Sequence, residues 1–384
     1  MAIHKEKYIT FSPYCAGLCN IIMSYEIFLA IAHITNRTVV LPPNCFIAFI
    51  SKTRENKNDW IDLWQIFDKN VLLQEFNCIE HEQVPEFRDK HIIMQSRNSY
   101  TGLIGMLKVT LNSVKFPNAN PNSAITHEVL VNQNDGSEDL KNFSNTREII
   151  ELNCDEQFLH FENNLFGHYW YNVYPGGENK RNELKDKINQ VFKYHDKFYQ
   201  YSDVVRHEIG PYNAIHVRRN DFLDTRKNEI QCVNAPEKIM EMVDKLPFDD
   251  KSLPLYISTD EQDRSFFNLL GEKYDIHFYE DFEYQFGDDF EEDNLHIAVL
   301  EQTICSQSEN FFGTYLSTFS KRINIMRGLE GRQADDHLGI NHLPETPYEN
   351  ILDAFPWSKR RDNKWHWNLS SYYQWMKEID GKLI

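Results

Sequence analysis

The regular alternation of short apolar runs with amphipathic stretches in the second half of the chain constrains the fold most. Apolar runs of three or four residues, bounded by turn residues, are typical of buried strands, and the longer stretches between them have helical periodicity. One of these stretches begins at Pro236, at a helix position where a missing N–H costs little. This alternation predicts a doubly wound α/β sheet with parallel strands. The expected strands are residues 214–217, 255–258, 276–278 and 311–313, and the expected helices are residues 236–246, 263–270, 295–305 and 318–326.

The first half begins with a similar unit. Residues 8–12 are expected to form a strand, residues 20–34 a helix, and residues 39–41 a second strand that two prolines stop. A strand, helix and strand of this length form a βαβ unit, the building block of parallel sheets. The stretch 117–139 is rich in Asn, Ser and Pro, which predicts a long loop or insertion, and residues 184–205 are expected to form one helix.

The length of 384 residues suggests two domains. We place the N-terminal Rossmann-like domain at residues 1–200 and the C-terminal one at residues 201–347. The tail, residues 348–384, is rich in Trp and Tyr, and we expect it to pack as helices across both domains.

The formal net charge of −18 excludes several classes of partner. Proteins that bind nucleic acid need a basic surface to displace counterions, and anionic membranes also repel an acidic chain. The longest apolar run, residues 27–34, is too short to span a bilayer. The chain also shows no secretory signal, and its seven cysteines are scattered, which together predict reduced thiols and a cytoplasmic location.

Much of the acidic excess lies in residues 280–293. A solvated loop is the favoured interpretation of this run. A metal site is the alternative, and the run lacks the spacing of a calcium-binding loop.

Four polar clusters follow expected strands, where open α/β sheets bind their ligands. They are residues 17–20 (Gly-Leu-Cys-Asn), 216–222 (His-Val-Arg-Arg-Asn-Asp-Phe), 258–261 (Ser-Thr-Asp-Glu) and 313–320 (Gly-Thr-Tyr-Leu-Ser-Thr-Phe-Ser). Paired arginines suit a phosphate, carboxylates suit ribose hydroxyls, and a hydroxyl-rich helix start suits a diphosphate. Each cluster taken alone also fits an ordinary helix cap or a surface ion pair.

Together and in this order, the clusters resemble the GDP-fucose-dependent fucosyltransferases, which include the protein O-fucosyltransferases and the related α1,6-fucosyltransferases. Residues 32–43 (Ala-His-Ile-Thr-Asn-Arg-Thr-Val-Val-Leu-Pro-Pro) add to the resemblance. It implies a GT-B fold of two facing Rossmann-like domains, with the donor bound mainly to the second. It also implies an inverting transfer of L-fucose from GDP-fucose to a glycan or protein acceptor, with neither a metal nor a cofactor.

The resemblance also implies roles for particular residues. Arg218 would hold the β-phosphate and offset charge as GDP leaves, and Asn20 would reach the β-phosphate or the sugar. The other residues expected at the substrate are Gly17, His216, Arg219, Asp221, Asp260, Glu301, Ser317, Thr318 and Phe319.

The chain departs from the family pattern in three places. Many members carry an aspartate for the nucleotide base where this chain has Glu301, and the loop 16–20 lacks the glutamate that serves some members as a base. Many relatives also carry a polar Gln or Arg directly after the Asn, where this chain has Ile21 and Ile22. The general base is therefore unassigned, and Glu26 is expected to face solvent from its helix. These departures leave two alternatives: a GT-B enzyme that uses another nucleotide sugar, and a non-catalytic carbohydrate-binding or scaffold protein.

Overall fold

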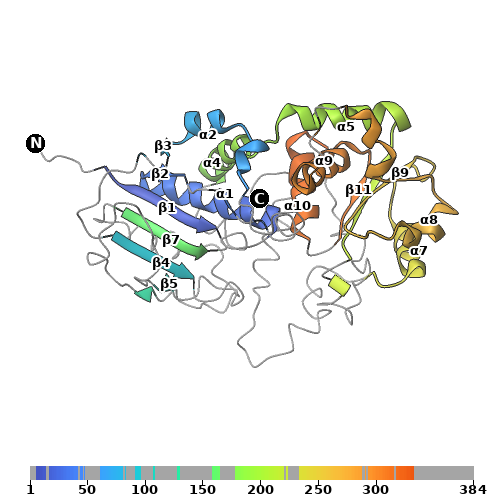
Figure 1. Cartoon of the computed structure of the whole chain (residues 1–384), viewed down its shortest axis with the longest axis horizontal. Coiled ribbons are helices and arrows are strands. Elements are labelled where there is room, and N and C mark those ends of the chain that lie inside the picture. The colour runs from blue at the N-terminus through green and yellow to red at the C-terminus, as the bar shows by residue number, and fades with distance from the viewer. Residues whose placement is uncertain are drawn as a thin grey trace, which may run out of the picture. The chain divides into compact units, whose positions relative to one another are not determined.

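The computed structural model divides the chain into two compact units, the first ending at Lys193 and the second beginning at Tyr194 (Figure 1). The residues that the structure describes are 6–13, 17–41, 44–45, 47, 61–80, 83, 91–96, 107–108, 128–129, 158–164, 178–219, 222–223, 233–287, 290, 293–314 and 317–332. The aromatic tail, residues 348–384, and most of the expected loop 117–139 lie outside the described residues.

The first unit is built on a mostly parallel sheet with the strand order β3-β2-β1-β7-β4-β5-β6. The interior strand β1 pairs in parallel with β2 and with β7, while β5 pairs antiparallel with both β4 and β6. The strands are β1 (Tyr8–Pro13), β2 (Thr38–Val40), β3 (Cys78–Ile79), β4 (His91–Ser96), β5 (Leu107–Lys108), β6 (Glu128–Val129) and β7 (Phe158–Asn164). The expected βαβ unit is therefore present, and β6 falls inside the stretch expected to be a loop.

The helix that crosses from β1 to β2 is α1 (Leu18–Thr35). It ends at Asn36, which adopts the left-handed conformation with φ of 49° and donates its N–H to the carbonyl of His33. Side chains on several sides of α1 are buried, as the consecutive residues Ile21, Ile22 and Met23 show. The helix is thus apolar nearly all round, as expected of a helix enclosed by protein.

A second helix, α4 (Glu178–Val191), covers α1 and also contacts α2 (Lys69–Glu75). Lys185 of α4 and Glu26 of α1 form an ion pair at 3.0 Å, and neither side chain is more than 2% exposed. The expectation that Glu26 faces solvent was wrong. A charged residue in a helix usually faces solvent, but α4, from far along the sequence, covers that side of α1.

The expected single helix 184–205 is also wrong, because the structure has two helices there. After α4, the backbone of His195 is extended, and α5 (Asp196–Ile209) begins as part of the second unit. Between the helices, Tyr194 is buried and donates its hydroxyl to Gln302, 2.7 Å away. The expected domain boundary at residue 200 falls within α5, and the structure divides the units before that helix.

The second unit has a four-stranded parallel sheet in the order β10-β9-β8-β11. Its strands are β8 (Asn213–Val217), β9 (Leu255–Thr259), β10 (Ile276–His277) and β11 (Phe311–Phe312). Its longer helices besides α5 are α7 (Pro236–Lys245), α9 (Asn294–Gln307) and α10 (Thr318–Leu329). The expected helix 263–270 is instead a 3-10 turn, η7 (Arg264–Phe267), followed by the short helix α8 (Asn268–Gly271).

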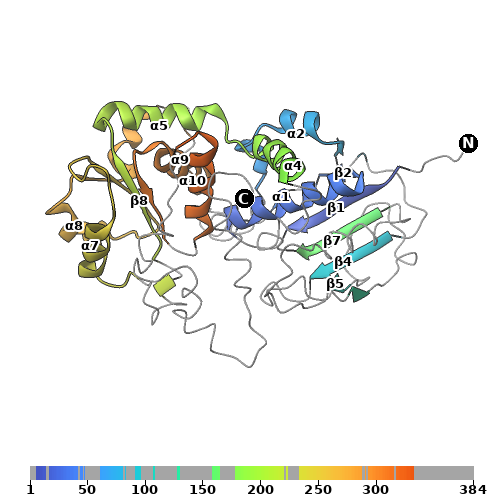
Figure 2. The ribbon, with the colours of Figure 1, turned by 180° about the vertical axis from the view of Figure 1, so that it is seen from behind.

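Helices cover both faces of this sheet (Figure 2). Alternate residues of a strand point to opposite faces, so Ile215 and Val217 join an apolar core with α7 and α8, while His216 points toward α10. Strand β9 follows the same rule, with Leu255 and Ile257 in that core. The face of the sheet that packs on α7 and α8 is thus mainly apolar, and the opposite face carries the polar side chain of His216.

The acidic segment 280–293 is structured where it is described. It forms the 3-10 turns η8 (Tyr279–Asp281) and η9 (Glu283–Gln285), with Tyr279, Phe282 and Phe286 buried beneath the exposed carboxylates. The ring of Tyr201 from α5 meets Phe286 edge to face at 5.5 Å. The described residues contain no group of side chains that could hold a metal ion.

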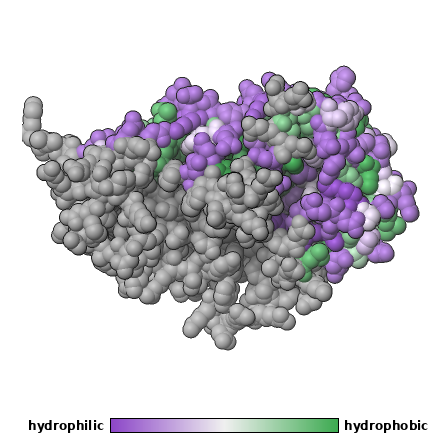
Figure 3. Space-filling view, viewed as in Figure 1, coloured by the Kyte–Doolittle hydropathy of each residue, from purple (hydrophilic) through white to green (hydrophobic). Residues whose placement is uncertain are grey.

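Hydrophilic residues dominate the coloured surface in Figure 3, with hydrophobic residues in small separate patches. The large hydrophobic side chains exposed among the described residues are Leu73, Tyr284 and Leu329. None of the helices that can be followed in the described ranges is both long and apolar enough to cross a bilayer.

Candidate functional site

The candidate site lies at the carboxyl edge of the sheet in the second unit, where β8, β9 and β11 end side by side. Parallel pairing places Val217 opposite Thr259, and Ile215 opposite Phe312, so the loops after these strands meet. Thr314, after β11, donates its hydroxyl to the carbonyl of His216 at 2.8 Å and accepts the N–H of Arg218 at 2.9 Å. Three of the four predicted polar clusters therefore come together at one edge.

His216 links β8 to the first turn of α10. Its Nδ1 lies 2.7 Å from the hydroxyl of Ser320, and its ring stacks on Phe319 with the centroids 4.6 Å apart. Burial, helped by the charge of Arg218, lowers the pKa of His216 from 6.5 to about 3. The imidazole is therefore neutral at physiological pH and is a fixed partner for α10.

The start of α10 packs closely on the end of β11. A Cβ atom on Gly313 would lie 2.3 Å from the Cβ and hydroxyl of Ser320, so only glycine permits this approach. Ser317 precedes the helix and is buried, while Thr318 and Phe319 in the first turn are half-buried. The N–H groups of a first helical turn have no intrahelical acceptors, which makes this end of α10 suited to an anion.

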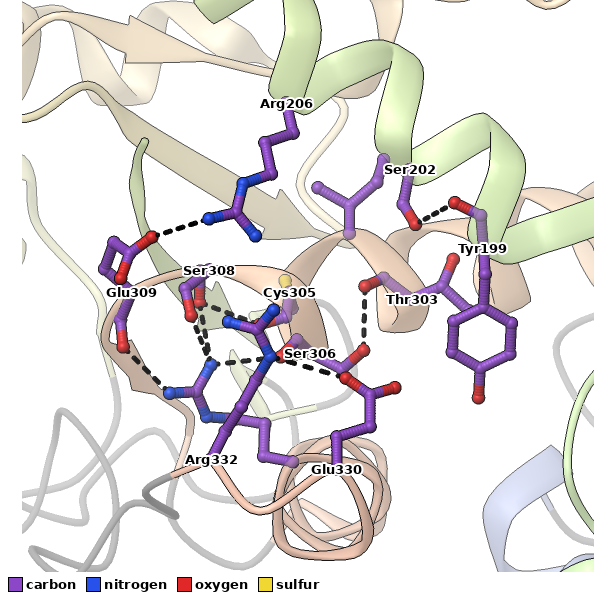
Figure 4. A network of polar contacts seen from close by, with 12 residues as sticks. Tyr199, Ser202, Arg206, Thr303, Cys305, Ser306, Ser308, Glu309, Glu330 and Arg332 are labelled. Carbon is purple, nitrogen blue, oxygen red and sulfur yellow. Dashed lines mark hydrogen bonds and ion pairs between the residues drawn. The ribbon is translucent and has the colours of Figure 1, made fainter. Parts of the chain in front are cut away.

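The far end of α10 is anchored to the turn between α9 and β11. Arg327 is buried and donates to the carbonyls of Ser306, Ser308 and Glu309. Beside this turn, Arg206 of α5 pairs with Glu309 at 3.0 Å (Figure 4). Carbonyl groups at the end of a helix lack intrahelical donors and favour a cation. The bonds from Arg327 to the end of α9 therefore hold α10 in place, which fixes the position of its first turn.

The two neighbouring arginines have different surroundings. Arg218 is half-exposed, and its guanidinium lies 5.6 Å from the ring of Phe222. Arg219 is 8% exposed, and its guanidinium bonds to Glu261 and to the carbonyl of Val233. Arg218 therefore keeps more exposed surface at the sheet edge than Arg219, whose guanidinium lies in protein contacts.

The carboxylates expected at the substrate are also partly engaged within the protein. Asp260 accepts the N–H of Arg219 at 2.6 Å. Glu301, on α9, is half-buried, and burial together with Glu280 and Asp260 raises its pKa to about 8 against the opposing charge of Arg264. At this pKa, most of the Glu301 carboxyl groups carry a proton at neutral pH.

The remaining predicted residues belong to the first unit or lie outside the description. Gly17 is the residue before α1, and its carbonyl accepts the N–H groups of Asn20 and Ile21. Asn20 is half-buried, and its Oδ1 atom has no hydrogen-bond partner among the described residues. Asp221 lies outside the described residues.

Sequence reasoning did not assign Thr314 or Ser320 to the site, although both lie in the quoted 313–320 cluster. Both hydroxyls bond to His216, one to its carbonyl and one to its ring. The available signal was their position beside a strand end and in a first helical turn. Hydroxyls are so common at helix starts that the residue types alone did not separate a structural role from a ligand contact.

The two units with parallel sheets define an α/β protein with the GT-B fold, which confirms the predicted fold class. The family model described as GDP-fucose protein O-fucosyltransferase matches residues 8–330, and the chain belongs to this family. The family expected from the sequence is therefore confirmed.

Two curated relatives and one solved structure illustrate the similarity. GDP-fucose protein O-fucosyltransferase 2 of Caenorhabditis elegans is 30% identical over 126 residues, 32% of this chain and 27% of that protein. The Homo sapiens protein of the same name is 24% identical over 165 residues, 42% of this chain and 33% of that protein. The matches thus span a third or less of these relatives' length.

The crystal structure of POFUT1 in its apo form aligns with a TM-score of 0.51 at 15% sequence identity. The alignment covers 86% of this chain and 98% of that chain, so the fold is shared over nearly the whole of POFUT1.

Proposed function

We propose that this protein transfers L-fucose from GDP-fucose to a hydroxyl group of a glycan or protein acceptor, with inversion at the anomeric carbon. The observation that carries the proposal is that Arg218 and the first turn of α10 lie at the same edge of the sheet. A cation and a helix start offer complementary contacts for a diphosphate. Family membership supports the same donor, since the relatives are named for GDP-fucose.

In this mechanism, the acceptor oxygen attacks the anomeric carbon while the bond from that carbon to the β-phosphate oxygen breaks. The electron pair goes to the phosphate, so negative charge grows on the departing GDP. The Arg218 guanidinium stabilises that charge, and the N–H groups of Thr318 and Phe319 hold the diphosphate. Positioning and electrostatics thus provide most of the catalysis.

The acceptor proton goes late to the leaving phosphate in this scheme. The loop 16–20 has no carboxylate, and Glu26 is buried in its ion pair with Lys185. A buried, paired carboxylate has no path to an acceptor hydroxyl, which supports a mechanism without a dedicated base from α1.

The first experiment is a calorimetric titration with GDP, combined with measurement of GDP release from GDP-fucose. Arg218→Ala should weaken GDP binding and lower turnover by about 100-fold, as expected when an oxyanion-stabilising donor is lost. Arg206→Ala is the matched control, since it removes the same charge from the exposed pair with Glu309. Unchanged turnover in Arg218→Ala would refute the proposal.

The measurements of GDP binding and GDP release also separate the competing functions. Turnover that survives EDTA supports the metal-independent mechanism, and an acceptor glycan array then identifies the acceptor. GDP binding without release of GDP from GDP-fucose over hours would instead favour a non-catalytic carbohydrate-binding protein.

A GT-B enzyme with a different nucleotide sugar is the second candidate, and Glu301 is the observation that favours it. An ionised carboxylate accepts both N–H donors of guanine, whereas a protonated one must donate one bond as well. A melting-shift panel of GDP, UDP, ADP and CMP distinguishes the two candidates, because the proposed donor requires the largest stabilisation by GDP.

A further inference from the structure

We propose that Arg219 is a positioning residue that fixes the loop carrying Arg218, and that it does not itself contact the donor. The inference rests on the proposed function, because it concerns how Arg218 is directed toward the diphosphate. It also revises the expectation that two neighbouring arginines hold the ligand together.

The Arg219 side chain joins three parts of the second unit. Its Nε donates to Glu261 after β9 at 2.8 Å, and its Nη1 donates to the carbonyl of Val233, just before α7, at 2.5 Å. The central carbon of its guanidinium, Cζ, lies over the ring of Phe266 in η7, 3.4 Å from the ring centroid. A planar fork can meet two acceptors and a ring face at once, whereas a lysine ammonium cannot satisfy this geometry.

The backbone of the same loop is held at consecutive positions. The N–H of Arg218 bonds to the hydroxyl of Thr314, and the N–H of Arg219 bonds to the carboxylate of Asp260. Leu223 in turn donates its N–H to the carbonyl of Arg219 at 2.7 Å. Because β8 has ended, these side-chain bonds replace the ladder that would otherwise orient residues 218 and 219.

The charge of Arg219 is matched inside the protein. Burial opposes ionisation of Glu261, but the N–H of Asp263 and the Arg219 guanidinium outweigh it and lower the pKa of Glu261 below 4.5. Glu261 is therefore ionised, and the pair with Arg219 carries no net charge. An anion at the sheet edge gains little direct attraction from such a pair.

The direction in which Glu261→Gln changes GDP affinity separates a positioning role of Arg219 from direct attraction of the donor. If electrostatic attraction alone governed binding, Glu261→Gln would remove a nearby negative charge and tighten GDP binding. If Arg219 positions Arg218 through Glu261, the same variant should weaken GDP binding about tenfold, the equivalent of one charge-assisted hydrogen bond. Glu309→Gln is the matched control, since it removes one carboxylate of an exposed ion pair at the opposite sheet edge and should leave binding unchanged.

A double-mutant cycle gives the second test. Arg219→Lys and the double variant Arg219→Lys/Glu261→Gln should be equally impaired, because both remove the same contact. The loss should fall more on kcat than on KM, since Arg218 acts on charge that develops during bond breaking. Additive losses would mean that Arg219 contacts the donor independently and would overturn the inference.

Phe266→Leu gives an independent measurement if Glu261→Gln folds poorly. It changes no charge, so direct attraction predicts no effect on GDP affinity, whereas loss of the supporting ring predicts weaker binding and lower kcat. Tighter or unchanged GDP binding in either variant, with circular dichroism like that of the wild type, refutes the inference. The proposed function itself is tested separately by Arg218→Ala.

Discussion

Replacing His216 by Asn tests whether the interior of the candidate site excludes charge. The imidazole is 4% exposed and its Nδ1 bonds to Ser320. An Asn side chain places an amide near the position of Nδ1, so it can keep a partner for the Ser320 hydroxyl while losing the ability to gain a proton.

The magnitude follows from the two pKa values of His216. The folded value is about 3, and the unfolded value is about 6.5. Between about pH 6.5 and pH 3, the imidazole is therefore protonated in the unfolded chain but not in the folded one. The free energy of unfolding falls as the pH drops through this range. At about 1.36 kcal/mol per pH unit, the 1.5 units between about pH 6.5 and pH 5.0 cost the wild type about 2 kcal/mol.

The assay is urea unfolding followed by circular dichroism at pH 7.5 and pH 5.0. The wild type should lose about 2 kcal/mol more stability than His216→Asn over this interval. Other titrating groups, including Glu301, are common to both proteins and cancel in the comparison. His207→Asn, at an exposed position of α5, is the control and should follow the wild type.

The difference in unfolding free energy between wild type and His216→Asn is the decisive quantity. If it changes by less than about 0.5 kcal/mol between pH 7.5 and pH 5.0, the imidazole does not resist protonation in the folded protein. This result would refute the reasoning, because the folded imidazole would then gain its proton as easily as the unfolded one. The contact with Ser320 would then be a charged hydrogen bond, and the site would tolerate positive charge beside Arg218.

Three further predictions concern other parts of the structure. Gly313→Ala forces Ser320, and with it the first turn of α10, away from the end of β11, so urea unfolding should show a loss of about 2 kcal/mol, and GDP titration should show weaker binding. Lys185→Met leaves the buried carboxylate of Glu26 without its cation and should cost about 3–5 kcal/mol in the same assay, whereas adding Glu26→Leu should recover most of that loss. The pKa of Glu301 is about 8 in the folded protein, above its unfolded value of 4.5, so the wild type loses stability as the pH rises between these values. Glu301→Gln lacks this titration, so its free energy of unfolding should rise by about 3 kcal/mol relative to that of the wild type between pH 5.0 and 7.5.

The strands of the second unit could be predicted from the sequence because their apolar runs are short, separate and bounded by turns. Residues 214–217 and 255–258 were each expected to within one residue of β8 and β9. The break at residues 192–195 could not be predicted in this way. Phe192 and Tyr194 are both buried, one in each unit, so apolar periodicity continues across a point where the helix stops.

The different surroundings of Arg218 and Arg219 could not be predicted from the cluster 216–222 alone. The partners of Arg219 lie 42 and 14 residues away in the sequence, and only the fold brings them to one place. Glu26 was misjudged for the same reason, since its cation is 159 residues away. Local patterns predict which residues are polar at a strand end, but pairing with distant residues decides which of them remain accessible.

This pairing also explains how a chain with a net charge of −18 offers a site for an anion. Asp260 and Glu261 lie at the same sheet edge as Arg218, and unpaired they would repel a diphosphate. Glu261 is matched by the Arg219 guanidinium, and Asp260 accepts the Arg219 N–H. Arg219 thus compensates the negative charge of residues 260 and 261 inside the protein. A diphosphate at this edge is therefore expected to meet the Arg218 guanidinium and the first turn of α10.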